Sequence, residues 1–312
     1  MIMVEGCNCT GTRIIGFFAL FLCLTIMTGI LLIFPKTEVL IAENGPVINK
    51  EIIQLDQASH SGEALFQELL QAEDDQVGLA HVSLRLAQEE YPEMKIEKYL
   101  ECIDWYAKII KTRISDKKEP EKVINIISDF IFKELGFSYV KTGYLKDLYL
   151  NDVLDRRKGN CVGMSILFLS IAERLGLPLF GVNVPEHIFV RYDDGETDIN
   201  IETGHEGICL SDSFYIAHSL EQFDVRSVKN GTYLKNLTKK EVISNVFLNR
   251  SKIMRNSGKL EEALNDCNKS ILLKPKDPAA YCNRGVIFEK MKMIPEAIKS
   301  YGRAISLNQK YS

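Results

Sequence analysis

The sequence has little excess charge and no metal-binding cysteine motif, and each absence excludes a class of function. Its 312 residues contain 38 Lys and Arg against 42 Asp and Glu, for a net charge of -4. A nucleic-acid-binding protein normally carries a basic stripe, so we expect no nucleic-acid partner. The eight cysteines form no CxxC motif and no Cys/His pair at zinc-ligand spacing. We therefore expect no metal, no cofactor and no disulfide framework.

One long stretch, residues 14–34, lacks charge altogether and is long enough to span a bilayer as a helix. A secretory signal peptide has a shorter apolar region and an A-x-A-like cleavage site, and neither is present. We therefore favour an uncleaved, single-pass membrane anchor over a signal peptide. The flanking Arg13 and Lys36 specify its orientation only weakly. We expect the C-terminal domains on the extracytoplasmic side.

The rest of the chain divides around that stretch. Residues 1–13 form a short tail, and residues 35–62 are weakly periodic, which is typical of a linker. Residues 63–236 form one domain of mixed pattern, and residues 238–312 form a second, helical one. Between residues 63 and 136, apolar side chains recur at helical spacing in four groups, which predicts four helices with a shared core.

The centre of the mixed domain is residues 161–175, which are apolar on almost every side. A helix without a polar face is a buried one. Asn160 is a preferred N-cap and Gly176 supplies a stop signal. Cys161 therefore lies in the first turn, directly after Arg156, Arg157 and Lys158. A helix N-terminus and nearby cations both favour a thiolate.

Beyond Pro178 the pattern changes to strands, predicted over residues 179–184, 187–192 and 196–202. Asp193-Asp194-Gly195 is a short hairpin signal between the last two strands. A two-residue turn at Asp194-Gly195 places His187 opposite Glu202 and Arg191 opposite Asp198. Opposed side chains share one face of the sheet.

A repeat begins at Thr238, which forms a capping box with Glu241. Asn249-Arg250 recurs as Asn283-Arg284 and Glu262-Ala263 as Glu296-Ala297, each 34 residues apart. This is the period of a tetratricopeptide helix pair. Two such units cannot cover their own apolar faces, so we expect them to pack on the preceding domain or on a partner.

Three residues of the mixed domain form a constellation suited to acyl transfer. Cys161 begins the buried helix, His187 begins a strand 26 residues later, and Glu202 lies on the adjacent strand. The histidine can take the thiol proton, and the acid can hold its imidazole in the productive tautomer. The helix N-terminus can stabilise the oxyanion. The alternative is that Cys161 is a small core residue and His187 is structural.

Three motifs in order carry a resemblance to a known family: VLDRRKGNC at 153–161, IAERLGLP at 171–178 and GVNVPEHIFVR at 181–191. With them the sequence resembles the transglutaminase-like superfamily, specifically its SirB-type branch fused to tetratricopeptide repeats. The resemblance extends more loosely over residues 76–236. It implies an α+β, papain-like core in which a helix bundle packs on an antiparallel sheet, followed by an all-α repeat segment.

The resemblance also implies roles for the site residues. Cys161 matches the family nucleophile and His187 its base. Glu202 stands where the superfamily usually has Asp, and Asn200 on the same face is the alternative third residue. His205 and Cys209 are competitors only if the strand register slips.

Two functions follow. The first is a membrane-anchored thiol enzyme that acts on amide bonds of a protein or peptide substrate, as protease, peptidase or transamidase, with repeats that bind a protein partner. The second is a non-catalytic scaffold, because several SirB-type relatives keep the fold without the cysteine. In that case the repeats supply the function through protein–protein interaction.

Overall fold

The computed structural model describes residues 62–115, 119–141, 143–218 and 225–308. The predicted tail and membrane anchor, and all of the predicted linker except Gly62, lie outside these residues. None of the helices within these residues is both long and apolar enough to cross a membrane.

The predicted N-terminal helices are confirmed. They are α1 (Gly62–Gln71), α2 (Leu79–Ala87), α3 (Ile96–Arg113) and α4 (Pro120–Ser128), with a short turn η1 (Asp74–Gln76) between α1 and α2. A π-helical turn, η2 (Asp129–Glu134), continues α4. The apolar stripes seen in the sequence form the buried faces of these helices and contribute to one main core. Trp105, outside those stripes, is more than half exposed.

Three short elements lead to the central helix. A parallel pair of two-residue strands, β1 (Ser138–Tyr139) and β2 (Lys158–Gly159), encloses the turn η3 (Leu145–Asp147) and helix α5 (Leu150–Arg156). Helix α6 then runs over the predicted range, Cys161–Leu175. Twelve of its residues are buried, as its lack of a polar face predicts. Gly176 ends the helix in the left-handed conformation, with φ of 62°, which glycine adopts without strain.

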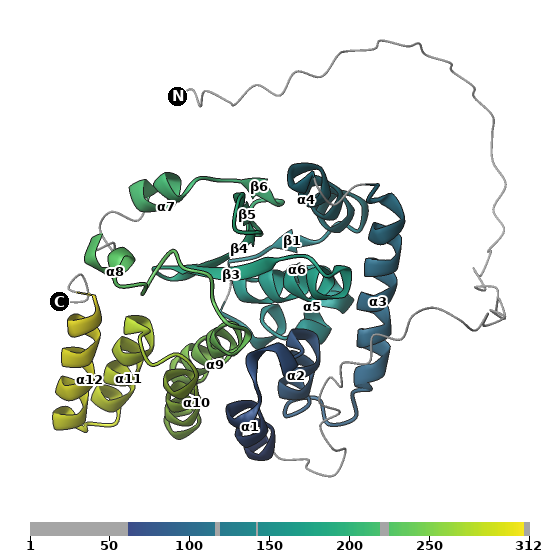
Figure 1. Ribbon diagram of the computed structural model, residues 1–312. Helices are drawn as coiled ribbons and strands as arrows, with labels where there is room; N and C mark the ends of the chain where they lie inside the picture. The colour runs from purple at the N-terminus through teal and green to yellow at the C-terminus, as the bar shows by residue number, and fades with distance from the viewer. Residues whose placement is uncertain (1–61, 116–118, 142, 219–224, 309–312) are drawn as a thin grey trace, which may run out of the picture. The chain divides into compact units, whose positions relative to one another are not determined.

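The main sheet is antiparallel, in the order β3-β4-β5-β6. Its strands are β3 (Leu179–Val184), β4 (His187–Asp193), β5 (Asp198–Glu202) and β6 (Ile208–Cys209). Figure 1 shows α6 lying beside β3 and β4. One face, which includes Ile188, Val190 and Ile201, joins the main core with α6. Val182, Val184 and Phe189 alternate with them and form a second core with Tyr215, Tyr233 and Leu234.

The predicted register of β4 and β5 is wrong by two residues. Arg191 pairs with Asn200 and Asp193 with Asp198, so β5 begins later than predicted. The turn is longer because Asp194 Oδ1 accepts hydrogen bonds from the backbone N–H groups of Glu196 (3.0 Å) and Thr197 (2.8 Å). A shift of two preserves the alternation of faces. His187 and Glu202 therefore still share a face, as diagonal neighbours instead of an opposed pair.

The C-terminal part is helical. Two short helices, α7 (Asp212–His218) and α8 (Val225–Lys229), precede α9 (Lys239–Asn256), α10 (Leu260–Leu273), α11 (Pro278–Lys290) and α12 (Ile294–Leu307). Figure 1 shows α9 to α12 side by side. The capping box is confirmed, with Glu241 N donating to Thr238 Oγ1 and Thr238 N to Glu241 Oε2. Where α11 meets α12, a Cβ on Gly285 would lie 2.5 Å from the Tyr301 ring, so only glycine fits there.

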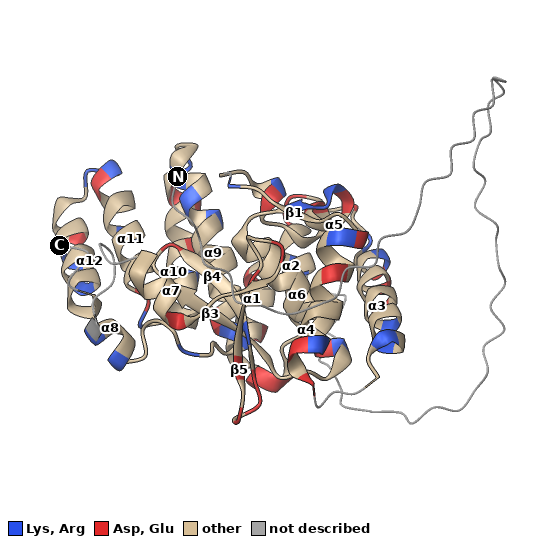
Figure 2. Cartoon of the chain, turned by 90° about the horizontal axis from the view of Figure 1, so that it is seen from above, with Lys and Arg blue, Asp and Glu red and all other residues tan. Residues whose placement is uncertain are grey.

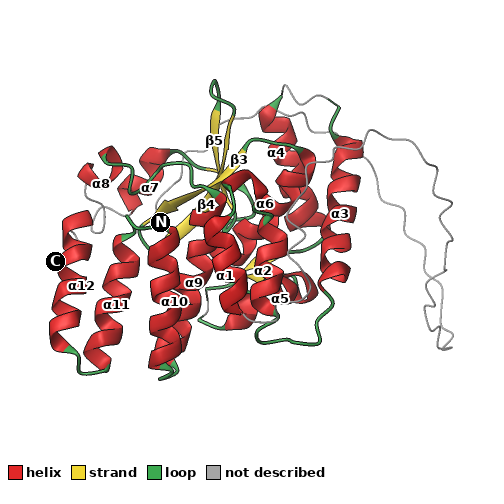
Figure 3. Cartoon of the chain, turned by 60° about the horizontal axis from the view of Figure 1, so that its bottom comes forward, coloured by secondary structure: helices red, strands yellow, loops and turns green. Residues whose placement is uncertain are grey.

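Helix α9 joins the repeats to the first domain, which confirms the predicted packing. Val242, Val246 and Phe247 of α9 belong to the main core, and the Phe247 ring meets that of Phe66 edge to face at 5.6 Å. Figure 3 shows α1 and α2 beside α9 and α10. The fold is thus a helix-rich α+β core with a small antiparallel sheet, continuous with a helical repeat region.

Candidate functional site

Cys161 lies at the first position of α6, and local hydrogen bonds fix it there. Asn160 is the N-cap, and its Oδ1 accepts from Gly163 N at 2.9 Å. The Asn160 N–H in turn donates to the Asp147 carbonyl at 2.7 Å. A Cβ on Gly163 would lie 2.9 Å from Val153 and 3.0 Å from the Asp147 carbonyl, so the first turn of α6 packs closely on η3 and α5. Cys161 itself is only partly buried.

The arginines before Cys161 do not serve the role that the sequence suggested. Arg156 forms an ion pair with the buried Asp147 at 2.7 Å. Arg157 donates to the Leu135 carbonyl at 2.9 Å. Both guanidinium groups are therefore engaged by neighbouring loops, and the groups found against Cys161 are the helix N-terminus and a histidine.

That histidine is His187, and the structure brings the three predicted site residues together. The ring of His187 is hydrogen-bonded to the Cys161 side chain. Its Nε2–H donates to Glu202 Oε2 at 2.7 Å. The side chain of Glu202 is 5% exposed and that of His187 26%. A continuous chain of hydrogen bonds thus runs from the partly buried thiol to a buried carboxylate.

Two further donors hold Glu202 in place. Gly204 N donates to Oε1 at 2.7 Å, and the Tyr215 hydroxyl donates to Oε2 at 3.0 Å. Burial would raise the pKa of Glu202, but its hydrogen bonds and the positive charge of His187 outweigh burial and lower the pKa. The carboxylate is therefore ionised at neutral pH.

The charge of His187 follows from its partners. Burial would lower the pKa of His187, but the hydrogen bonds and negative charges of Cys161 and Glu202 outweigh it and raise the pKa to about 10. The ring is therefore an imidazolium at neutral pH, hydrogen-bonded to a sulfur on one side and to a carboxylate on the other.

Asn200, the alternative third residue, is engaged elsewhere. Its Oδ1 accepts from Arg191 Nε at 2.7 Å, and its Nδ2 donates to Asp212 Oδ1 at 2.8 Å. Of the two competitors of the thiol pair, Cys209 lies apart. Cys209 pairs with Ile201 across β5 and β6 and lines a separate cavity with Asn200 and Asp212. His205 donates its backbone N–H to the Glu202 carbonyl.

Sequence reasoning missed two tyrosines at the site. Tyr215 stacks on Phe189 with ring centroids 4.1 Å apart, which directs its hydroxyl to Glu202. The Tyr139 ring of β1 lies against Gly204, next to the Glu202 carboxylate, and burial and then the negative charges of Cys161 and Glu202 raise its pKa. Neither tyrosine lies in a periodic pattern, and both reach the site from distant segments. The only signal in the sequence was the alternation of β4, which puts the apolar Phe189 on the same face as His187 and so indicates that another side chain covers that face.

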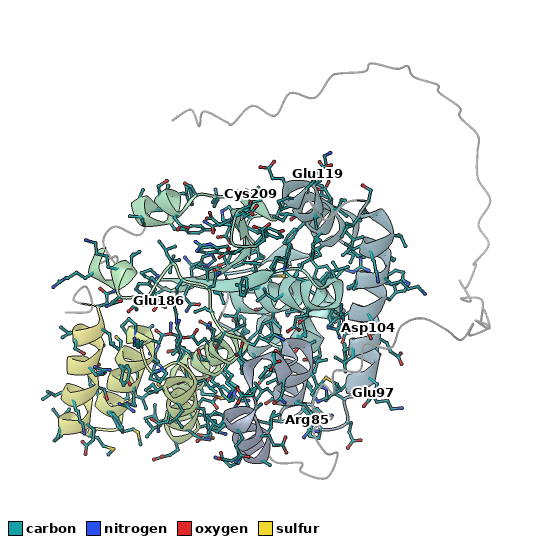
Figure 4. All side chains as sticks on the ribbon, viewed as in Figure 1. Arg85, Glu97, Asp104, Glu119, Glu186 and Cys209 are labelled. Atoms are coloured by element: carbon teal, nitrogen blue, oxygen red, sulfur yellow. The ribbon has the colours of Figure 1, made fainter. Side chains whose placement is uncertain are left out.

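Cys161 and His187 open into a cavity of about 140 Å³. Its walls come from the turn between β3 and β4, from α9 and from the start of α11. Glu186, labelled in Figure 4, lies in that turn and forms an ion pair with Lys252 of α9 at 2.5 Å. The predicted site thus faces both the sheet and the repeats.

The charged side chains of the described elements are mixed. Figure 2 shows Lys and Arg interspersed with Asp and Glu on most helices, with acidic residues at the tip of the β4–β5 hairpin. Among the residues that the structure covers, no group of three or more His, Cys, Asp or Glu could hold a metal ion.

Comparisons with known families agree with this architecture. The transglutaminase-like superfamily matches residues 97–247. Two tetratricopeptide repeat families match residues 252–292 and 278–311.

Among curated proteins, a UPF0162 protein of Xylella fastidiosa strain Temecula1 is 22% identical over 260 residues, or 78% of this chain and 88% of the relative. A UPF0162 protein of strain 9a5c is 23% identical over 241 residues, or 72% of this chain and 82% of that relative. F-box only protein 21 of Mus musculus is 36% identical over 76 residues, which is 24% of this chain and 12% of that protein. A crystal structure of menin has a TM-score of 0.43 and 13% identity, over 78% of this chain and 68% of menin.

Proposed function

Because the chain carries a transglutaminase-like domain followed by C-terminal tetratricopeptide repeats, we propose that it is a membrane-anchored thiol enzyme that acts on amide bonds. The observation that supports this most is the hydrogen-bonded chain of Cys161, His187 and Glu202 at the edge of a cavity. A structural histidine would need neither a partly buried thiol on one side nor an ionised carboxylate on the other.

The chemistry follows from the charge of each group. An imidazolium next to a thiol favours the nucleophilic thiolate. The Cys161 sulfur attacks the carbonyl carbon of the amide, and His187 gives its proton to the leaving nitrogen. The C–N bond breaks, the amine leaves and a thioester to Cys161 remains. Water or a second amine then attacks the thioester, His187 takes its proton, and the thiolate is released.

The start of α6 provides the electrostatic part of the reaction. The first N–H groups of a helix have no partner within the helix, and Asn160 satisfies one of them, on Gly163. The remaining N–H groups of the first turn stabilise the oxyanion that forms when Cys161 attacks. Glu202 keeps the His187 ring oriented and stabilises its positive charge through both half-reactions.

The other parts of the chain locate the enzyme. Tetratricopeptide repeats imply protein–protein interaction, so the C-terminal repeats recruit a protein partner or substrate. Residues 14–34 would hold the chain in a membrane in a single pass, because they are uncharged over a bilayer-spanning length. The catalytic domain and repeats would then lie together on the extracytoplasmic side.

Thiol reactivity tests the proposal directly. Iodoacetamide labelling of the full chain from pH 5 to pH 9, read by peptide mass spectrometry, should alkylate Cys161 well below pH 8.5, where a free cysteine titrates. Cys209 is an internal control, because partial desolvation of its thiol raises its pKa although the residue as a whole is solvent-accessible. Equal pH profiles for the two cysteines would exclude an activated thiol.

A second candidate is the non-catalytic scaffold. It is favoured by exposed apolar side chains at the C-terminal end of the repeats, where Ile294 and Ile298 of α12 are 50% and 66% exposed. These side chains suit a protein contact and need no chemistry. The labelling experiment separates the two functions, because a scaffold has no reason to keep Cys161 activated.

A further inference from the structure

The cavity at Cys161 has two walls of different origin. One comes from the transglutaminase-like domain and includes Asn183 of β3 and Glu186 of the following turn. The other comes from the repeats and includes Asn245, Asn249 and Lys252, which follow one another along α9. A substrate that reaches the thiol therefore contacts the first repeat helix.

The repeat wall is rigid. The first turn of α9 is fixed by Asp74, whose carboxylate accepts from the backbone N–H groups of Lys239 (3.0 Å) and Lys240 (3.1 Å). Further along α9, Arg250 forms ion pairs with Glu89 and with Asp266, both at 2.6 Å. The residues of α9 that face the cavity are thus already in place before a substrate arrives.

The amide side chains of this cavity use their N–H donors within the protein. Asn183 Nδ2 donates to Asn245 Oδ1 at 3.0 Å, and Asn245 Nδ2 donates to the Glu241 carbonyl at 3.0 Å. Asn249 Nδ2 donates to the Asn245 carbonyl at 2.9 Å. Because Asn183 and Asn249 use their Nδ2 groups in these bonds, their amide oxygens take no part in the network.

Neither oxygen accepts one of these network hydrogen bonds. Asn183 Oδ1 is buried and accepts no hydrogen bond. Asn249 is half-buried, and the hydrogen bond of its side chain is made by Nδ2. Asn249, which lines the cavity and is partly exposed, can offer its oxygen to a donor from a ligand, and such a hydrogen bond stabilises the complex. The wall is therefore suited to ligands that present N–H groups.

The charges around the cavity are paired. Lys252 neutralises Glu186 at 2.5 Å, and Lys274 lies 3.5 Å from Asp277 at the start of α11. Neither positive nor negative charge is in excess at the cavity. A charged side chain of a substrate would therefore find no unpaired partner of opposite charge there. Uncharged N–H donors next to a carbonyl are what a peptide backbone presents.

We propose that Asn249 of the first repeat, supported by Asn183, binds backbone N–H groups of an extended peptide whose carbonyl lies at Cys161. The repeats then take part in substrate selection within the active cavity, in addition to recruiting partners outside it. The substrate class is a peptide or unfolded protein segment. This inference rests on the proposed thiol chemistry.

The test compares two alkylating peptides on the full chain. Acetyl-trialanyl chloromethyl ketone forms a bond from the Cys161 sulfur to the methylene carbon as chloride leaves. A second reagent is identical but N-methylated at every amide, which removes the donors. Wild type should react about tenfold faster with the first, the value of a hydrogen bond of ordinary strength. Iodoacetamide measures the reactivity of the thiol itself.

Variants at Asn249 decide the outcome. Asn249→Leu, of similar size without the acceptor, should reduce the preference to within about twofold. Asn249→Gln keeps both the amide donor and the acceptor, adds no charge, and should keep the preference. Asn265→Leu, on an exposed position of α10, is the matched control and should behave as wild type. All four proteins should react equally with iodoacetamide.

Two results would overturn the inference in distinguishable ways. An unchanged preference in Asn249→Leu, with rapid iodoacetamide labelling of Cys161, refutes recognition by the repeat wall and leaves the thiol chemistry intact. Slow iodoacetamide labelling of Cys161 in wild type refutes the thiol chemistry and this inference with it. If Asn249→Leu misfolds, shown by loss of the cooperative thermal transition of wild type, Asn249→Ala provides the same comparison.

Discussion

Two ion pairs lie on the same face of strands β4 and β5. At one end His187 meets Glu202, and at the other Arg191 meets Asp212 at 2.5 Å, with the stacked rings of Phe189 and Tyr215 between them. Arg191 also donates to Asn200 Oδ1 and to the Leu234 carbonyl. Its three contacts close the cluster on itself, whereas the contacts of His187 lead to a thiol and a cavity.

The difference lies in what each cation can do with its proton. A guanidinium stays charged at every accessible pH, so the Arg191 cluster can only hold β4, β5 and α7 together. An imidazolium can give up its proton and take it back. A cation paired with a carboxylate thus serves structure at one end of the strands and, in the proposed function, chemistry at the other. The predictions below test that division.

The largest effect is expected at the thiol. Cys161→Ala should reduce turnover of an amide substrate to background, a loss of up to about 10⁶-fold by analogy with other nucleophile deletions. The thermal midpoint should change little, because the residue is partly exposed. Activity assays with a peptide library, alongside a thermal melt, measure both. Turnover that survives the substitution would place the nucleophile elsewhere.

Next comes the carboxylate that orients His187. Glu202→Gln keeps the shape but removes the charge, and the equivalent change in a serine protease costs about 10⁴ in turnover. Asn200→Ala is the control at the other end of the strands, and its effect should be on stability only. Rates are compared per folded molecule. If Asn200→Ala were inactive while Glu202→Gln worked normally, Asn200 would be the third residue.

Arg191→Leu should show the opposite pattern. Loss of a buried ion pair leaves its partner groups unsatisfied, and we expect the free energy of unfolding to fall by about 3 kcal/mol, less than the upper range because Asp212 is partly exposed. Urea titration gives the stability and iodoacetamide labelling the site. A variant that is stable but has an unreactive Cys161 would contradict the division between the two ends.

The pH dependence of stability separates the two cations as well. The folded-state pKa of His187, about 10, lies above the unfolded value of about 6.5. Its contribution to stability is therefore fully present below pH 6.5 and is lost as the pH rises through about 10. Unfolding of wild type and His187→Gln at several pH values isolates this contribution, and parallel curves would contradict it.

The smallest effect is expected where the cavity meets solvent. The Lys252–Glu186 pair joins a side chain that is 25% exposed to one that is 53% exposed. Such pairs contribute less than about 1 kcal/mol. Lys252→Ala should therefore leave the thermal midpoint almost unchanged, at low and at high salt. A drop of several degrees would show that this pair, too, is structural.

Local signals explain which parts of the fold were predictable. Helix α6 was predicted to its ends because Asn160, an apolar run and Gly176 each specify the same boundaries. The strand register was not, because Asp194 builds a longer turn with its side chain than Asp-Gly alone indicates. Glu202 was identified from a wrong register that happened to keep the right face.

Contacts between distant segments explain what the sequence could not predict. Tyr139 and Tyr215 carry no pattern that marks them, and the preference of Arg156 for Asp147 over the thiol depends on a loop conformation. The repeats were predicted from their 34-residue period, but this period does not indicate which residues of α9 face Cys161. Only the packing of α9 into the main core places Asn249 in the cavity.

The packing of α9 against α1 and α2 has a consequence for synthesis of the chain. Asp74 accepts hydrogen bonds from the backbone N–H groups of Lys239 and Lys240, which follow it by 165 and 166 positions. Phe66 likewise packs on Phe247, which is synthesised much later. A chain emerging from the ribosome exposes these N-terminal apolar faces until α9 is made. Contacts of such separation also slow folding. The first domain can therefore finish folding only after helix α9 has been translated, and a chain truncated before α9 would lack one wall of the Cys161 cavity.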